Sequence, residues 1–194
     1  MIKNVIVDVT ALIPFPNSEI SEPDLVKNKG LINHFSSILA DIFDLNVIST
    51  DLALDRLLSL EQSSDPNINS MVLAGLGGIH TFVGNYINAF SAFRKSLDLV
   101  DNNEVLAIVY SELSTLLRKL EYKSEAIALI RGALGKTTNE TLIWKLRTQL
   151  GLCYKYSEPE IARGYLFKSY KYYDSVNYYP RKARILRHLG SIYI

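Results

Sequence analysis

A small residue recurs along the last two thirds of this chain, each time directly after a leucine. The residues are Gly77, Ser114, Gly151 and Gly190, which lie 37, 37 and 39 positions apart. A glycine inside a helix costs about 1 kcal/mol relative to alanine, so its periodic return needs a packing reason. Two antiparallel helices supply one, because helix axes about 8–10 Å apart leave room only for small side chains where they cross.

Other residue types repeat at fixed offsets from each small one. A large residue follows three positions later, at His80, Leu117, Tyr154 and Tyr193. A second set of small, large and small residues comes next, at Ala89, Phe93 and Ser96, at Ala126, Ile130 and Ala133, and at Ala162, Leu166 and Ser169. Self-similarity with a period of roughly 20–50 residues indicates stacked structural repeats.

This pattern resembles the tetratricopeptide repeat, which has Leu-Gly and Tyr on the first helix of a hairpin and Ala, an aromatic residue and Ala on the second. The resemblance covers residues 71–194, although the period of 37 exceeds the family's usual value of about 34. It implies an all-α fold, a right-handed superhelix of stacked antiparallel helical hairpins. It also implies a concave partner-binding face lined by the first helix of each hairpin.

Weaker copies of the pattern extend toward the N-terminus. One period before Gly77, a matching set occurs at Leu39, Ala40, Phe43, Ala53, Leu57 and Leu60. We therefore expect a degenerate first hairpin over residues 29–62, a polar linker over residues 61–69, and tetratricopeptide-like repeats within residues 63–194 that end in a single terminal helix. Helix breaks are expected at Gly84, at Pro159 and at Pro180.

Residues 1–28 read as an N-terminal arm with one short strand. The apolar, β-branched run from Val5 to Ile13 favours an extended segment, which would pack on the first repeat or pair with another chain. Asp8 in this run faintly resembles the metal-binding aspartate of the opening strand of PIN-type nucleases. That fold needs further strands and carboxylates, so we expect no enzyme activity and no catalytic residue.

Other motifs that suggest chemistry are explained by helix packing. Gly132 to Thr137 resembles part of a phosphate-binding loop, but Ile130 stands where that loop needs a glycine. None of the three histidines, His34, His80 and His188, has a second ligand at a metal-binding spacing. We therefore expect no cofactor and no metal.

Charge is distributed unevenly along the chain, although the net charge is only +1. Residues 1–70 carry 4 basic and 10 acidic side chains, whereas residues 141–194 carry 10 basic and 3 acidic ones. Three interpretations remain open: drift on solvated helix faces, an acidic partner on the basic end, or head-to-tail association of unlike ends.

The family register predicts which side chains line the concave face. The candidate partner-binding residues are Phe82, Glu112, Arg118, Lys119, Lys145, Gln149, Tyr156, Arg184, Arg187 and His188. This surface becomes increasingly basic along the chain, which suits an acidic peptide or a protein segment with a carboxylate. We therefore predict a non-enzymatic scaffold that binds a peptide or protein within a larger assembly.

Two other functions stay open. The first is an intracellular receptor or regulator that senses a short signalling peptide. The second is nucleic-acid binding through the basic, Tyr-rich C-terminal part, which the near-neutral overall charge makes less favourable.

The sequence also predicts the cellular compartment of the protein and the way in which its last helix is covered. A lone cysteine, Cys153, favours a reducing compartment, and no apolar run approaches the ~18 residues of a membrane span. We therefore expect a cytoplasmic or nuclear protein without a signal peptide. Apolar residues in the last helix, among them Leu186 and Leu189, predict self-association or burial in a partner.

Overall fold

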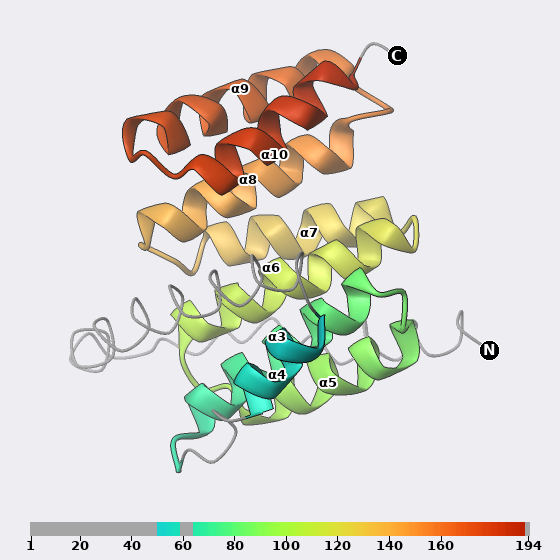
Figure 1. Ribbon diagram of the computed structural model, residues 1–194, viewed down its shortest axis with the longest axis vertical. Coiled ribbons are helices and arrows are strands. Elements are labelled where there is room, and N and C mark those ends of the chain that lie inside the picture. The colour runs from blue at the N-terminus through green and yellow to red at the C-terminus, as the bar shows by residue number, and fades with distance from the viewer. Residues whose placement is uncertain (1–49, 59–63, 193–194) are drawn as a thin grey trace.

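The computed structural model describes residues 50–58 and 64–192, and every regular element in these ranges is an α-helix (Figure 1). The all-α expectation is therefore confirmed for this part of the chain, whereas the expected N-terminal strand and the first helix of the degenerate hairpin lie outside the described residues. The helices are α3 (Thr50–Leu58), α4 (Pro66–Phe82), α5 (Tyr86–Leu99), α6 (Asn103–Lys119), α7 (Lys123–Leu134), α8 (Glu140–Tyr154), α9 (Pro159–Ser175) and α10 (Tyr179–Gly190).

Consecutive helices pair as hairpins, and the pairs are stacked along the long axis of the molecule (Figure 1). Helix α4 packs on α5, α6 on α7, and α8 on α9, while α10 packs on α9. The first helices also contact one another, α4 with α6 and α6 with α8. Short turns make the two helices of each pair antiparallel neighbours. The 37-residue period of the sequence thus corresponds to one helical hairpin.

Local sequence signals explain where several helices begin and end. Gly84 has a φ of +82°, a left-handed conformation that turns the chain from α4 into α5. Pro159 opens α9 and Pro180 lies in the first turn of α10, as the sequence predicts. The polar linker expected over residues 61–69 is too long, however, because α4 begins at Pro66. The Asp65 side chain caps this helix by accepting a hydrogen bond from the backbone N–H of Asn67.

Two of the periodic glycines lie where paired helices touch. A methyl group added at Gly77 would lie 2.7 Å from the ring of Phe93 on α5. One added at Gly151 would lie 2.9 Å from Leu166 on α9. Real Cβ atoms do not approach other atoms so closely, so each helix pair depends on the missing side chain. Gly190 is the exception, because no described atom lies within 4 Å of the corresponding position.

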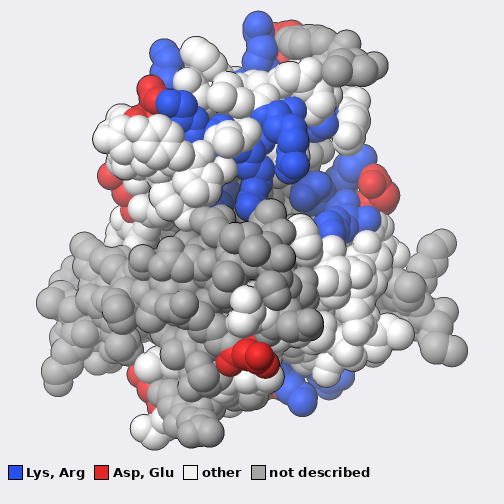
Figure 2. Space-filling model, in the orientation of Figure 1, with Lys and Arg blue, Asp and Glu red and all other residues white. Residues whose placement is uncertain are grey.

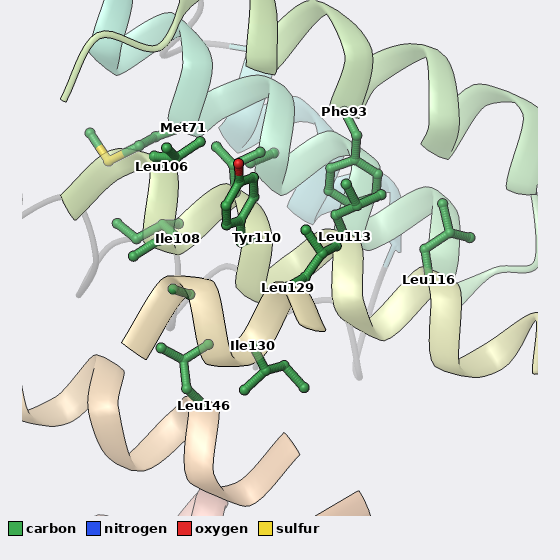
Figure 3. Close-up of a cluster of buried hydrophobic side chains, with 14 of the residues drawn as sticks. Met71, Phe93, Leu106, Ile108, Tyr110, Leu113, Leu116, Leu129, Ile130 and Leu146 are labelled. Atoms are coloured by element: carbon green, nitrogen blue, oxygen red, sulfur yellow. The ribbon is translucent and has the colours of Figure 1, made fainter. Parts of the chain in front are cut away.

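The main hydrophobic core runs through the stacked pairs from α3 to α8, and Figure 3 shows its centre. Helix α6 lies in the middle of the stack and is buried on nearly its whole circumference, from Glu104 to Leu117. Ala53 and Leu57 of α3 are fully buried in the same core. Side chains labelled in Figure 3 include Met71 from α4, Phe93 from α5, Leu113 from α6, Ile130 from α7 and Leu146 from α8.

A smaller core lies at the C-terminal end of the stack. Tyr173, Leu166 and Ile185 are its buried members, and Leu189 and Ile192 pack against them. Trp144 of α8 stacks on Tyr172 of α9 with the ring centroids 5.2 Å apart. The terminal helix α10 thus covers α9 with one apolar side, while Leu186 on its other side stays 47% exposed.

We predict that Gly77→Ala lowers the free energy of unfolding by about 1–3 kcal/mol, because its new methyl group must displace Phe93. Gly164→Ala on α9 is the matched control, since no described atom lies within 4 Å of that position. The control should be neutral or more stable by up to about 1 kcal/mol, as alanine is the better helix former. Urea denaturation followed by circular dichroism measures both changes, and equal effects at the two glycines would contradict the packing explanation.

Candidate interaction surface

The first helices of neighbouring hairpins are joined by polar contacts as well as apolar ones. Lys145 of α8 forms an ion pair with Glu112 of α6, and both side chains are largely buried. Burial lowers the pKa of the Lys145 ammonium, and the nearby Glu112 carboxylate opposes this effect. Gln149 Nε2 of α8 donates to Ser111 Oγ at 3.2 Å, and the Ser114 hydroxyl donates to the Gln149 carboxamide oxygen. These contacts fix the register of α8 against α6.

A lysine links α6 back to the preceding hairpin. Lys119 Nζ donates to the backbone carbonyl oxygens of Thr81 at 2.9 Å and Phe82 at 3.3 Å. Its ammonium also lies 5.8 Å from the centroid of the Phe82 ring. Burial, with a smaller contribution from the Arg118 charge, lowers the pKa of Lys119. The predicted residues Phe82 and Lys119 are therefore brought together, at the C-terminal ends of α4 and α6.

A cluster of basic side chains lies near the ends of α6, α8 and α10. Its centre is His188, whose pKa falls from 6.5 to about 4. Burial is the largest cause, followed by the charges of Arg187, Lys155, Arg118 and Arg184. Four cations from three helices thus act on one imidazole, which is neutral at pH 7. We call Arg118, Lys155, Arg187 and His188 the basic cluster.

Hydroxyl groups, not carboxylates, bind the most buried cation of the cluster. Lys155 is only 9% exposed, and its Nζ donates to Ser191 Oγ at 2.9 Å and to the Tyr156 hydroxyl at 3.2 Å. Among the residues that the structure describes, none of Arg118, Lys155 and Arg187 forms an ion pair with a carboxylate. Their positive charge is therefore not neutralised within this part of the chain.

Tyr156 lies beside this cluster and is 77% exposed. The Lys155 ammonium lies 4.8 Å from its ring centroid, and the Lys123 ammonium lies 5.9 Å from it. An exposed aromatic ring close to two cations offers apolar contact area next to positive charge.

Figure 2 shows how the charge is distributed on one face of the molecule. Lys and Arg gather over α10 and the neighbouring ends of the α6 to α8 layer, whereas most Asp and Glu visible on this face lie at its margins. This arrangement places positive charge from residues distant in sequence on one continuous part of the surface.

The ten residues predicted from the sequence fall into three groups, of which Phe82 and Lys119 form the first. Arg118, Arg184, Arg187 and His188 come together around one point, and Tyr156 lies beside them. Glu112, Lys145 and Gln149, in contrast, bond to neighbouring helices and have largely buried or partly buried side chains. The reason is that α6 is buried almost all round, so its inward side is not an open groove.

Some contributors were missed by reasoning from the sequence. Ser191 holds the Lys155 ammonium, and Lys123 lies over Tyr156. Ser191 follows Lys155 by 36 positions, close to the repeat period but out of register with the small residues, so no sequence signal identifies this contact.

Comparison with models of known protein families, with curated proteins and with solved structures gave no significant match. Within residues 50–58 and 64–192, the structure shows no cluster of three or more His, Cys, Asp or Glu side chains suited to a metal ion. No helix in the same ranges combines the length and the apolar character needed to cross a membrane. The site is therefore interpreted from its geometry alone.

We predict that Glu112 and Lys145 are strongly coupled. A double-mutant cycle built from Glu112→Gln and Lys145→Met should give a coupling energy of about 1–3 kcal/mol, because the pair is shielded from water. The exposed pair Glu160 and Arg163, whose side chains are 66% and 58% exposed, is the matched control and should give a smaller value. Urea titration of all the variants measures both cycles, and equal coupling in the two would contradict the assignment.

We also predict that His188 titrates near pH 4 and responds to its cationic neighbours. Arg187→Gln removes one of the charges that disfavour the imidazolium, so the pKa of His188 should rise toward 6.5. Arg163→Gln is the control, because Arg163 is not among the charges that act on His188. Histidine ring signals in NMR spectra recorded from pH 3 to pH 8 provide the measurement. A pKa of His188 that is the same in all three proteins would contradict the cluster.

Proposed function

We propose that this chain is a non-enzymatic, tetratricopeptide-like scaffold that binds an acidic peptide or protein segment within a larger assembly. The observation that carries the proposal is the basic cluster, in which cations from three separate helices converge without a carboxylate partner among the described residues. Bringing like charges together costs free energy, so an anionic partner that neutralises them gains it.

The arrangement of the helices supports the same proposal. Helical hairpins stacked with a 37-residue period match what the family resemblance implies, and we propose that they follow its right-handed superhelical path. Such stacks present extended surfaces built by several repeats, so one partner segment can contact α6, α8 and α10 together. The partner contacts would be charge-assisted hydrogen bonds to the arginines and apolar contact with Tyr156.

The expected position of the partner differs from a simple inner groove. Glu112, Lys145 and Gln149 tie α8 to α6, so in this proposal they hold the surface in shape and do not bind the partner directly. Arg118, Arg187, His188 and Tyr156 are the residues that would touch it. Phe82 and Lys119 would extend the surface toward the first described hairpin.

The presence of a single cysteine in the sequence, which allows no disulfide within the chain, is typical of a reducing compartment. Cys153 is buried, and its burial raises the pKa of the thiol to about 11. A thiol of this kind stays protonated at neutral pH and reacts slowly with oxidants. We therefore propose a cytoplasmic or nuclear protein, in which this residue serves packing.

We predict that a labelled, unstructured twelve-residue peptide containing six glutamates binds the full chain at low salt. Arg187→Glu should weaken this binding about tenfold or more, since a hydrogen bond to a charged group contributes about 1.5–3 kcal/mol. Lys168→Glu on the exposed side of α9 is the control, and it changes the net charge by the same amount. Fluorescence anisotropy measures the affinities.

The same assay separates the alternatives. If the peptide does not bind, or if both charge reversals weaken it equally, the basic cluster is not its site. Tighter binding of single-stranded RNA than of the acidic peptide, with a steep salt dependence, would favour nucleic-acid recognition instead. A strong preference for free peptides of five to ten residues over the same sequence inside a folded protein would favour a peptide receptor.

A further inference from the structure

In each described hairpin, the first helix contacts the second through one or two of three recurring positions. These are the small residue of the repeat and the residues four and seven positions before it. In α4 they include Ser70 and Gly77. The Ser70 and Ser96 hydroxyls lie 3.0 Å apart in a buried pair of hydrogen-bonded residues, and Gly77 accommodates the ring of Phe93.

The next two hairpins repeat this contact face. In α6, Tyr110 is buried and lies near Gly132 of α7, with 4.0 Å between its ring and a methyl group added there. In α8, Trp144 stacks on Tyr172 and Gly151 accommodates Leu166. The second helix therefore packs against this side of the first helix in each described hairpin, although Arg147 of α8, four positions before Gly151, stays exposed.

Helix α10 has the same three positions, but no helix within residues 50–58 or 64–192 buries them. They are Ala183, Leu186 and Gly190, and all three are exposed. No described atom lies within 4 Å of a methyl group added at Gly190, whereas the equivalent distances at Gly77 and Gly151 are below 3 Å. Tyr179, which is 65% exposed, extends this side of the helix by one turn. We call Tyr179, Ala183, Leu186 and Gly190 the open hairpin face.

The glycine at this position has no other structural reason in the described part of the chain. A glycine at a helix C-terminus often adopts a left-handed conformation that only glycine tolerates easily. Gly190 does not, since Gly84 is the only glycine with a positive φ in residues 64–192. Gly190 therefore suits the role that Gly77 and Gly151 have, because a glycine lets a large side chain of another helix approach the backbone.

We propose that the open hairpin face binds an amphipathic helix of an acidic partner protein, with a large apolar side chain seated on Gly190. The charge of α10 identifies the partner: this helix carries Arg181, Lys182, Arg184 and Arg187 and no acidic residue. A second copy of α10 placed against it would bring like charges together, which is destabilising. A helix with acidic side chains beside its apolar stripe complements both the charge and the shape. None of the four residues of this face belongs to the basic cluster, but Arg187 of that cluster contributes to the charge of α10, so the acidic character of the partner rests in part on the proposed function.

The chain itself supplies a probe for this site. A labelled peptide of residues 84–101 contains α5, whose Phe93 already fills the space over Gly77. Replacing Arg94 and Lys95 by glutamate in the peptide makes it acidic. The acidic peptide should bind the full chain saturably in fluorescence anisotropy, and more tightly than the unmodified peptide.

Two substitutions test whether an aromatic side chain of the peptide packs on Gly190. Gly190→Leu in the chain fills the space over the helix, and Phe93→Ala in the peptide removes the side chain that enters it. Each should weaken binding about tenfold or more, the range expected for losing a buried aromatic side chain. Gly164→Leu is the matched control, because Gly164 is also an exposed helical glycine with open space around it, and it should leave binding unchanged. Circular dichroism checks that both chain variants keep their helices.

The outcomes that would overturn the inference are distinct. Binding that persists in Gly190→Leu, or that does not depend on Phe93, would show that charge alone attracts the peptide, as expected for the basic cluster. No saturable binding of the acidic peptide would also overturn it. Sedimentation equilibrium provides the last test: a dimer of the free chain that Gly190→Leu abolishes would mean that a second copy occupies this face.

Discussion

The close approach of paired helices at Gly77 and Gly151 is the contact on which the rest of the structure depends. At these two points Phe93 and Leu166 lie where a side chain on the facing helix would otherwise be, so the axes can come near enough for the apolar rows to interlock. Each hairpin then buries too little surface to be stable alone. Stacking solves this problem, because α4, α6 and α8 contact one another and share one core.

Stacking also explains why polar groups and charges occur where they do. Burial of α6 on nearly all sides forces its polar residues to find partners on neighbouring helices, and Glu112 and Ser114 do so with Lys145 and Gln149 of α8. The same period that aligns these pairs also aligns the helix ends. Arg118 and Lys155, which are 37 positions apart, therefore lie at equivalent helix ends, and Arg187 joins them from α10 although it is out of register with the repeat. Stacking of the repeats thus leaves ion-paired and hydrogen-bonded side chains inside the stack and cations without a described carboxylate partner at its edge.

How much the sequence reveals depends on which kind of contact a residue makes. Periodic glycines and alanines predict the hairpins, because a close helix crossing restricts residue type strongly and locally. The side chains that form the surface were harder to assign: Glu112 and Lys145 fit the register of an inward face, but the buried position of α6 turns them into an internal pair. Partners of long flexible side chains, such as Ser191 for Lys155, depend on packing between repeats, which one sequence does not show. The start of α4 at Pro66 was missed because Asp65 and Asn67 look like loop residues until the cap forms.

The terminal helix α10 contributes to both proposed surfaces, the basic cluster and the open hairpin face. If the basic cluster served only to keep the protein in solution, its cations would gain most by spreading apart, yet all three of them, together with Arg184, act on the single imidazole of His188. If α10 served only to cover α9, its outer side would gain most from polar residues, yet Leu186 and Gly190 occupy it. Arg187 and His188 of the basic cluster lie on the same terminal helix as Leu186 and Gly190. A partner that is acidic, and that places an apolar side chain on Gly190, would relieve both departures. A single partner with an acidic extended segment followed by an amphipathic helix would satisfy the two surfaces at once.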